Sequence, residues 1–188
     1  MAYRKNQTNA QIVTLALKGI EGETSTGNMS TRGPSAWSNT GHMPRAWANL
    51  FGVRFRLGLV QSVIYSYSTP IAWLDDEHGW IIPNVSYSIT TSTKHQSHLY
   101  RLRGRTLSLP WDATPEDARR VLAGEMVFTS TGYGANRRFT GTRPGPNYKP
   151  EFPAFRSTVV HEDGSATERW VPGRIILDSE RGFINGGI

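Results

Sequence analysis

A tyrosine-rich run of β type, VIYSYSTPIAW at residues 63–73, most constrains how this chain can fold. Its β-branched and aromatic residues favour one long strand, or two strands interrupted at Pro70. Proline cannot donate to a strand ladder, so we expect Pro70 to mark a sheet edge or a bulge. The turn DDEHG at 75–79 follows, and then two short runs, WIIP at 80–83 and SYSI at 86–89. This spacing predicts an antiparallel meander.

A helix is predicted directly after the meander. Thr91 or Ser92 is suited to be its N-cap, and KHQSHLYRL at residues 94–102 follows, with Leu99 and Leu102 as the apolar positions. We expect this helix to pack on the sheet, so that residues 63–103 form one compact unit.

The second half of the chain begins another set of elements. Thr114 is a good N-cap, Pro115 fits the first helical position, and Gly124 ends the pattern, so a helix is predicted between them. The elements expected after it are a strand at 126–131, a loop at 132–150 and a hairpin that turns at Asp163 and Gly164.

The segments before the meander are less regular. Residues 10–18 suit either a helix or a strand, residues 19–46 are loop-like, and residues 45–51 suit a helical turn. The predicted fold class is α+β, a small antiparallel sheet with a packed helix, extended by a C-terminal helix and hairpin. We divide the chain into an N-terminal segment (1–24), a sheet and helix unit (25–105) and a C-terminal part (106–188), which together form one compact domain.

Charge is the main functional signal in the composition. The 188 residues carry a net charge of +6, and 17 of the 21 basic residues are arginine. The guanidinium group of arginine forms bidentate hydrogen bonds with phosphate and stacks on bases. A basic chain favours a polyanionic partner. A GC-rich genome would also replace lysine by arginine, but it would not explain the net positive charge.

Several classes of protein are excluded or disfavoured. The chain has no cysteine, which excludes disulfides and thiolate zinc sites. No run approaches the roughly 18–20 apolar residues of a membrane span. The apolar patch QIVTLALKGI at 11–20 lacks the flanks of a secretory signal. We therefore expect a cytoplasmic protein that does not bind membranes.

The runs YSYSTPIAW (65–73), GW (79–80) and YSITTSTKHQ (87–96) closely resemble an uncharacterised domain family of phage and plasmid proteins. Its pattern is YSYxTPIAW, then W, then YSxTTSKHQ, and the upstream GNMS and GHMPRAW resemble further elements. The chain departs from the pattern at Thr93, which separates Ser92 from Lys94, and at Met43, where leucine is usual. The resemblance covers about residues 25–103. It implies a phage accessory protein, and therefore an infected bacterial host, but no established activity.

The start of the predicted helix is the first candidate site. A helix N-terminus offers free N–H groups and partial positive charge, so hydroxyls and a lysine there suit a phosphate, and an amide could read a base edge. Simple capping of the helix is the alternative. The candidate residues are Thr91, Ser92, Lys94, His95 and Gln96.

Aromatic residues of the meander form the second candidate. They could make a stacking platform for exposed bases, or they could be an ordinary core between sheet and helix. Alternation places Tyr65 and Tyr67 on one face and Ile64 on the other, and we expect Trp73 and Tyr87 to be mostly buried. The full set is Tyr65, Tyr67, Trp73, Trp80 and Tyr87.

Two arginine clusters are the third candidate. If the chain is extended there, Arg101, Arg103 and Arg105 lie on one side of a strand. The glycine-rich loop after residue 131 lacks the GxxxxGK[ST] spacing of a phosphate-binding loop, so it is either an anion site or a solvated loop. Its arginines are Arg137, Arg138 and Arg143.

Metal binding and catalysis have little support. His95 and His98 are three residues apart, but a third ligand would have to come from His78 or Asp75, and no HExxH pattern or nucleophile elbow is present. We expect no cofactor. The leading hypothesis is a phage-encoded protein that binds nucleic acid without catalysis. The alternative is an interaction module that binds and inhibits a host protein, and the sequence leaves the oligomeric state open.

Overall fold

The computed structural model describes residues 3–34, 39–132, 136–148, 152–161 and 163–173. The chain divides into two compact units, Met1–Asn147 and Tyr148–Ile188. The boundaries predicted at residues 24 and 105 both lie inside the first unit. The fold class is α+β, as predicted.

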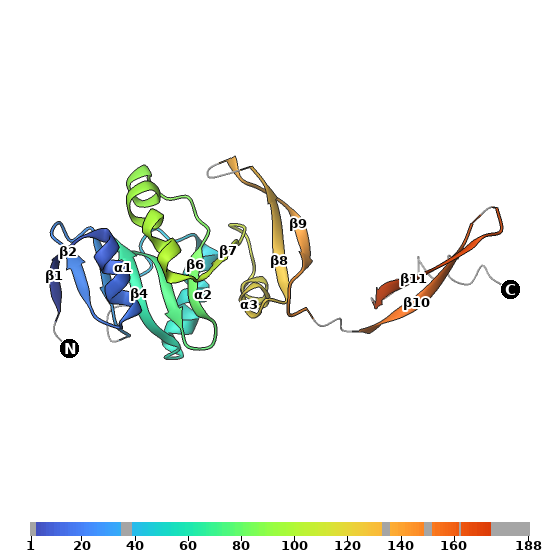
Figure 1. Cartoon of the computed structure of the whole chain (residues 1–188), viewed down its shortest axis with the longest axis horizontal. Helices are drawn as coiled ribbons and strands as arrows, with labels where there is room; N and C mark the ends of the chain where they lie inside the picture. Colours follow the sequence, from blue (N-terminus) through green and yellow to red (C-terminus); the bar gives the residue numbers. More distant parts are fainter. Residues whose placement is uncertain (1–2, 35–38, 133–135, 149–151, 162, 174–188) are drawn as a thin grey trace. The chain divides into compact units, whose positions relative to one another are not determined.

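A seven-stranded mixed sheet forms the centre of the first unit (Figure 1). In spatial order, which is also chain order, its strands are β1 (Arg4–Gln7), β2 (Gly22–Thr24), β3 (Met29–Arg32), β4 (Val60–Ser66), β5 (Thr69–Asp75), β6 (Gly79–Pro83) and β7 (Arg105–Leu107). The outermost pairs, β1–β2 and β6–β7, are parallel, and the pairs between them are antiparallel. The predicted meander is confirmed as β4 to β6, and the sheet continues on both sides of it.

The run at residues 63–73 belongs to two strands, and the turn between them falls at Tyr67 rather than at Pro70. Tyr67 has a φ of +55° in that turn, a strained value for a tyrosine. Pro70 lies opposite Tyr65, beside a register shift that leaves Ile71 without a facing residue. The prediction of a bulge at this proline is therefore confirmed.

Helices cover both faces of the sheet. On one face, α1 (Asn9–Leu17) packs beside η2 (Gln96–Leu102), a 3₁₀ helix that continues η1 (Thr91–His95), a short π-helix. On the other face, α2 (Arg45–Arg56) packs beside α3 (Pro115–Ala123). Neighbouring residues of β4 divide between the two cores: Ile64 joins the α1 side, and Val63 joins the α2 side. The sheet thus lies between two apolar layers.

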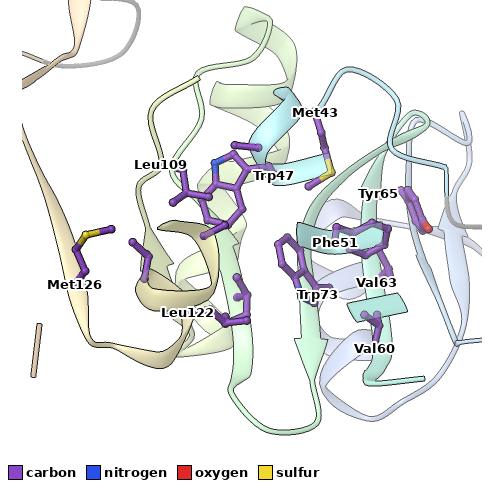
Figure 2. Close-up of a cluster of buried hydrophobic side chains, with 14 residues drawn as sticks. Met43, Trp47, Phe51, Val60, Val63, Tyr65, Trp73, Leu109, Leu122 and Met126 are labelled. Atoms are coloured by element: carbon purple, nitrogen blue, oxygen red, sulfur yellow. The ribbon is translucent and has the colours of Figure 1, made fainter. Parts of the chain in front are cut away.

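The core under α2 and α3 is built around two tryptophans (Figure 2). The rings of Trp47 and Trp73 meet edge to face, with centroids 6.0 Å apart, and Phe51 lies 5.3 Å from Trp73. All three side chains are fully buried. Burial of each such ring contributes on the order of 1.5–3 kcal/mol, so this cluster anchors α2 on the sheet.

Some predictions from the first ninety residues are wrong, and others are now resolved. The loop-like stretch 19–46 contains β2 and β3, and SYSI at 86–89 is not a strand. The helical turn at 45–51 is confirmed as the start of α2. Residues 10–18 lie largely in helix α1, because Thr8 and Gln11 form a reciprocal capping box at its start.

The elements after β7 follow their local signals. α3 has the predicted cap at Thr114 and proline at Pro115, and it ends at Gly124, whose φ of +75° suits glycine. β8 (Met126–Thr131) is confirmed, but the predicted loop 132–150 contains β9 (Arg138–Pro144), which pairs with β8 in a hairpin. In the second unit, β10 (Phe152–Val160) and β11 (Ala166–Gly173) form the predicted antiparallel hairpin.

Candidate functional site

The helical segment after β6 begins earlier than predicted. Helical structure starts at residue 89, and neither Thr91 nor Ser92 caps it. The hydroxyl oxygen of Ser88 accepts the N–H of Thr91 at 3.3 Å, and that of Ser92 accepts the N–H of Tyr87 at 3.2 Å. The predicted N-cap is therefore wrong, because Ser88 already serves the first turn.

Two of the predicted anion-binding residues lie in a closed hydrogen-bond cluster. The hydroxyl of Ser66, at the end of β4, lies 2.7 Å from Nδ1 of His95 and 3.0 Å from Oγ1 of Thr91. All three side chains are buried. Burial lowers the pKa of His95, and the nearby charges of His98 and Lys94 lower it further. Thr91 and His95 thus hold η1 against β4. Lys94 is exposed.

Ser92 and Gln96, by contrast, line a hollow at the surface. We call it the first hollow, and its volume is about 390 Å³. It is bordered by the segment after β6 (residues 84–86), by η1 and η2, by the loop before α3 and by the end of the β8–β9 hairpin. Its most informative lining residues are Asn84, Ser92, Gln96, Trp111, Arg137 and Phe139.

Arg137 ties the hairpin to the segment after β6. Its guanidinium donates to the backbone oxygen and to Oδ1 of Asn84, each at 2.9 Å. Both acceptors are neutral, and Arg137 has no salt bridge to any carboxylate in the described chain. Its positive charge is therefore held in a fixed place beside the first hollow and is not neutralised there.

Trp111 is the residue that the sequence analysis missed. Its side chain is 75% exposed although it is the largest apolar residue of the loop before α3. An exposed indole that borders a hollow is a feature of binding surfaces. The signal in the sequence was a lone tryptophan in the turn-forming stretch LPWDATP, but it does not distinguish an exposed ring from a buried one.

A second hollow, of about 340 Å³, shares Asn84, Val85 and Gln96 with the first. It is also bordered by Tyr100 and Arg103. Tyr100 is 72% exposed, and the guanidinium of Arg101 lies 5.7 Å from the centre of its ring. The two hollows therefore adjoin each other along the segment after β6.

The two arginine clusters do not form the expected rows. Arg101 lies in η2, Arg103 follows it with a φ of +50°, and only Arg105 is in a strand, so the three do not share one strand face. Arg105 donates to the backbone oxygen of Leu122 at 2.8 Å, which ties β7 to α3. Arg138 and Arg143 are exposed residues of β9, and none of these arginines has a salt bridge to a described residue.

The five aromatic residues of the meander do not form one platform. Tyr65 and Trp73 belong to the core under α2, whereas Trp80 and Tyr87 pack in the core under α1. Trp73 is fully buried and Tyr87 is partly buried, with burial raising the pKa of its phenol. Tyr67 is exposed in its turn, where its ring centroid lies 5.8 Å from that of His95.

One group in the described chain has side chains placed as metal ligands: Asp75, Glu77 and His78. The guanidinium of Arg54 already binds both carboxylates of this group. It donates to both oxygens of Asp75, at 2.8 and 2.7 Å, and to Glu77 at 2.7 Å. His95 and His98 are not part of the group, so the predicted ligands are not brought together. The cluster is best explained as a buried ion pair at the turn after β5.

Residues 2–107 match the model of a family of unknown function, DUF8033. The chain belongs to this family. The matched part ends with β7, so it contains the whole central sheet and all the residues that line the second hollow, whereas Trp111 and Arg137 lie beyond it. Neither a curated protein nor a solved structure matches the chain. Among the described residues, no helix has the length and apolar character needed to span a membrane.

Proposed function

We propose that this protein binds single-stranded nucleic acid, without catalysis, across the two adjoining hollows. In the phage or plasmid setting that the resemblance implies, this role belongs in the cytoplasm of a bacterial host. The observation that carries the proposal is the placement of an exposed indole, Trp111, and an unneutralised guanidinium, Arg137, at the same hollow. Aromatic rings beside fixed positive charge are how proteins bind single strands with little sequence preference.

The charge pattern supports phosphate contacts. Six arginines around or near the hollows, and on the hairpin beside them, lack a carboxylate partner in the described chain: Arg101, Arg103, Arg105, Arg137, Arg138 and Arg143. Four of them are exposed, Arg101, Arg103, Arg138 and Arg143, whereas Arg105 and Arg137 are partly buried and also donate to neutral oxygens of Leu122 and Asn84. Contacts to phosphate set the position of a strand and carry no sequence information.

The exposed rings favour single strands over duplex. Trp111 and Tyr100 stand out from the surface, where an unpaired base could stack on either one. Stacking contributes about 1–3 kcal/mol per base and requires a base that is not already stacked within a duplex. We therefore expect tighter binding to a single strand than to a duplex of the same length.

The experiment is a titration of labelled single-stranded and duplex oligonucleotides, followed by fluorescence anisotropy over a salt series. Affinity should fall with salt with a log–log slope of about −0.7 for each phosphate contacted on a single strand. The change Trp111→Ala should weaken binding about tenfold. The change of Arg137 and Arg138 to Glu should weaken binding to every sequence and flatten the slope.

The matched control is the change of Arg4 and Arg56 to Glu. Both are exposed and line neither hollow, so this variant has the same net charge as the Arg137 and Arg138 variant. It should retain most of the wild-type affinity. Absence of binding to any nucleic acid at low salt would overturn the proposal, and equal losses in the two double variants would show that only net charge acts.

A further inference from the structure

The two hollows have the same kinds of groups at their borders. The first has the exposed ring of Trp111 and the guanidinium of Arg137, and the second has the exposed ring of Tyr100 and Arg103. Each volume lies near the lower end of the about 300–1,000 Å³ that small-molecule sites occupy, so each suits one nucleotide. A ring for a base and an arginine for a phosphate thus occur twice, side by side.

Three residues line both hollows and form a shared wall: Asn84, Val85 and Gln96. Nearly all the polar groups of this wall have hydrogen-bond partners. Asn84 donates from its backbone to Leu107 and from Nδ2 to Ser108, and both of its oxygens accept from Arg137. Val85 donates to Pro83, and its backbone oxygen accepts Nε2 of Gln96 at 3.2 Å. Within the described chain, Oε1 of Gln96 is the side-chain atom of this wall that has no hydrogen-bond partner.

The bond from Nε2 to Val85 fixes the orientation of the Gln96 amide. One of the two N–H groups of Nε2 is engaged in this way, and the oxygen is presented as an acceptor between the two hollows. Adenine and cytosine offer an exocyclic amine to such an acceptor. Thymine and uracil offer a single ring N–H between two carbonyl oxygens, and these oxygens would be repelled by that of Gln96.

We propose that the two hollows bind two consecutive nucleotides and that Oε1 of Gln96 selects bases with an exocyclic amine over thymine and uracil. This inference rests on the proposed function, because it names the ligand of the same site. Gln96 is a specificity residue, while the two rings and the two arginines supply contacts that are independent of sequence. One hydrogen bond of this kind gives a preference of about 3- to 10-fold.

The test uses the full chain and single-stranded oligonucleotides of equal length made only of dA, only of dC or only of dT. Wild-type protein should bind dA and dC about 3- to 10-fold more tightly than dT. The change Gln96→Leu keeps the size of the side chain and removes the acceptor, so it should bring the three affinities to within about twofold. Gln61→Leu, the same change at an exposed position of β4, should leave the ratios as in the wild type.

A second measurement needs no variant of the protein. An oligonucleotide in which purine replaces adenine keeps the ring and lacks the exocyclic amine, so wild-type protein should bind it as weakly as it binds dT. A dinucleotide should also compete about tenfold better than a mononucleotide, because it engages both rings.

The outcomes separate this inference from the proposed function. Equal affinity for dA, dC and dT, or tight binding of the purine oligonucleotide, would overturn the role of Gln96 while nucleic-acid binding stands. Equal competition by mono- and dinucleotide would overturn the two-nucleotide site. If no oligonucleotide binds at low salt, the proposed function fails, and this inference fails with it.

Discussion

The hydroxyl group of Ser66 lies 2.7 Å from Nδ1 of His95, across 29 residues of sequence, and both residues are 1% exposed. This bond joins the end of β4 to the π-helical turn η1. It therefore fixes the start of the segment that continues into Gln96 and Tyr100 at the two hollows. A π-helical turn is uncommon and is frequently found at functional sites.

Stability should depend on the protonation of His95. Because its pKa is lowered in the folded chain, the unfolded chain takes up the proton at a higher pH than the folded chain does. The stabilisation is complete above the ordinary histidine pKa of about 6.5 and is lost as the pH falls below it, by at most about 1.4 kcal/mol per pH unit. Urea unfolding between about pH 8 and pH 5 measures this slope.

Two variants identify the source of that slope. His95→Gln keeps a hydrogen-bond partner for Ser66 but cannot titrate, so its free energy of unfolding should change less with pH. Burial lowers the pKa of His78 as well, so this residue acts in the same direction. If His78→Gln removes the slope and His95→Gln leaves it unchanged, the assignment to His95 is wrong.

Asp75 should be one of the most sensitive positions in the chain. Its carboxylate is fully buried, accepts two hydrogen bonds from Arg54 and accepts the backbone N–H groups of Glu77 and His78. Asp75→Asn removes the buried carboxylate of this pair and leaves Arg54 with only the exposed Glu77, so it should cost about 3 kcal/mol. Asp76→Asn, an exposed neighbour, should change the free energy of unfolding by less than about 0.5 kcal/mol. Similar losses in both would argue against the ion pair.

Local signals explain which elements could be predicted. The helix from Pro115 to Ala123 has a cap, a first-turn proline and a terminal glycine within eleven residues, and all of these act without the rest of the fold. The strands β2 and β3 have three and four residues, too few to show a period. They form because β3 pairs with β4, about thirty residues later, and the sequence does not show such pairing.

The candidate site was predictable only in part for the same reason. Gln96 and Arg137 were candidates because of their residue types, but their meeting at one hollow depends on the contact between Arg137 and Asn84. His95 was expected near an anion, and its burial follows from Ser66, a distant residue. The exposure of Trp111 likewise depends on what the fold leaves uncovered.

The cap of α3 should contribute measurably. The hydroxyl of Thr114 accepts the N–H of Asp117 at 3.1 Å and donates to its carboxylate at 2.7 Å. Thr114→Ala removes both bonds and should lower the free energy of unfolding by about 1 kcal/mol, as measured by urea titration. Thr114→Ser keeps the hydroxyl and should be close to wild type. A serine variant as unstable as the alanine variant would show that the methyl group, and not the cap, is responsible.

Gly104 should tolerate no side chain, because β7 approaches β6 closely at this point. A Cβ atom on Gly104 would lie 2.7 Å from the Cβ and from the backbone oxygen of Trp80, and the backbone cannot move away without disturbing β6. Overpacking of this kind costs about 1–3 kcal/mol, so Gly104→Ala should lower the midpoint of urea unfolding. Gly52→Ala is the matched control, since its nearest neighbour would be the mobile end of Arg56 at 3.5 Å. In the middle of α2 that change should raise stability by about 0.5–1 kcal/mol. If Gly104→Ala is as stable as the wild type, β6 and β7 do not lie as close together as this structure places them.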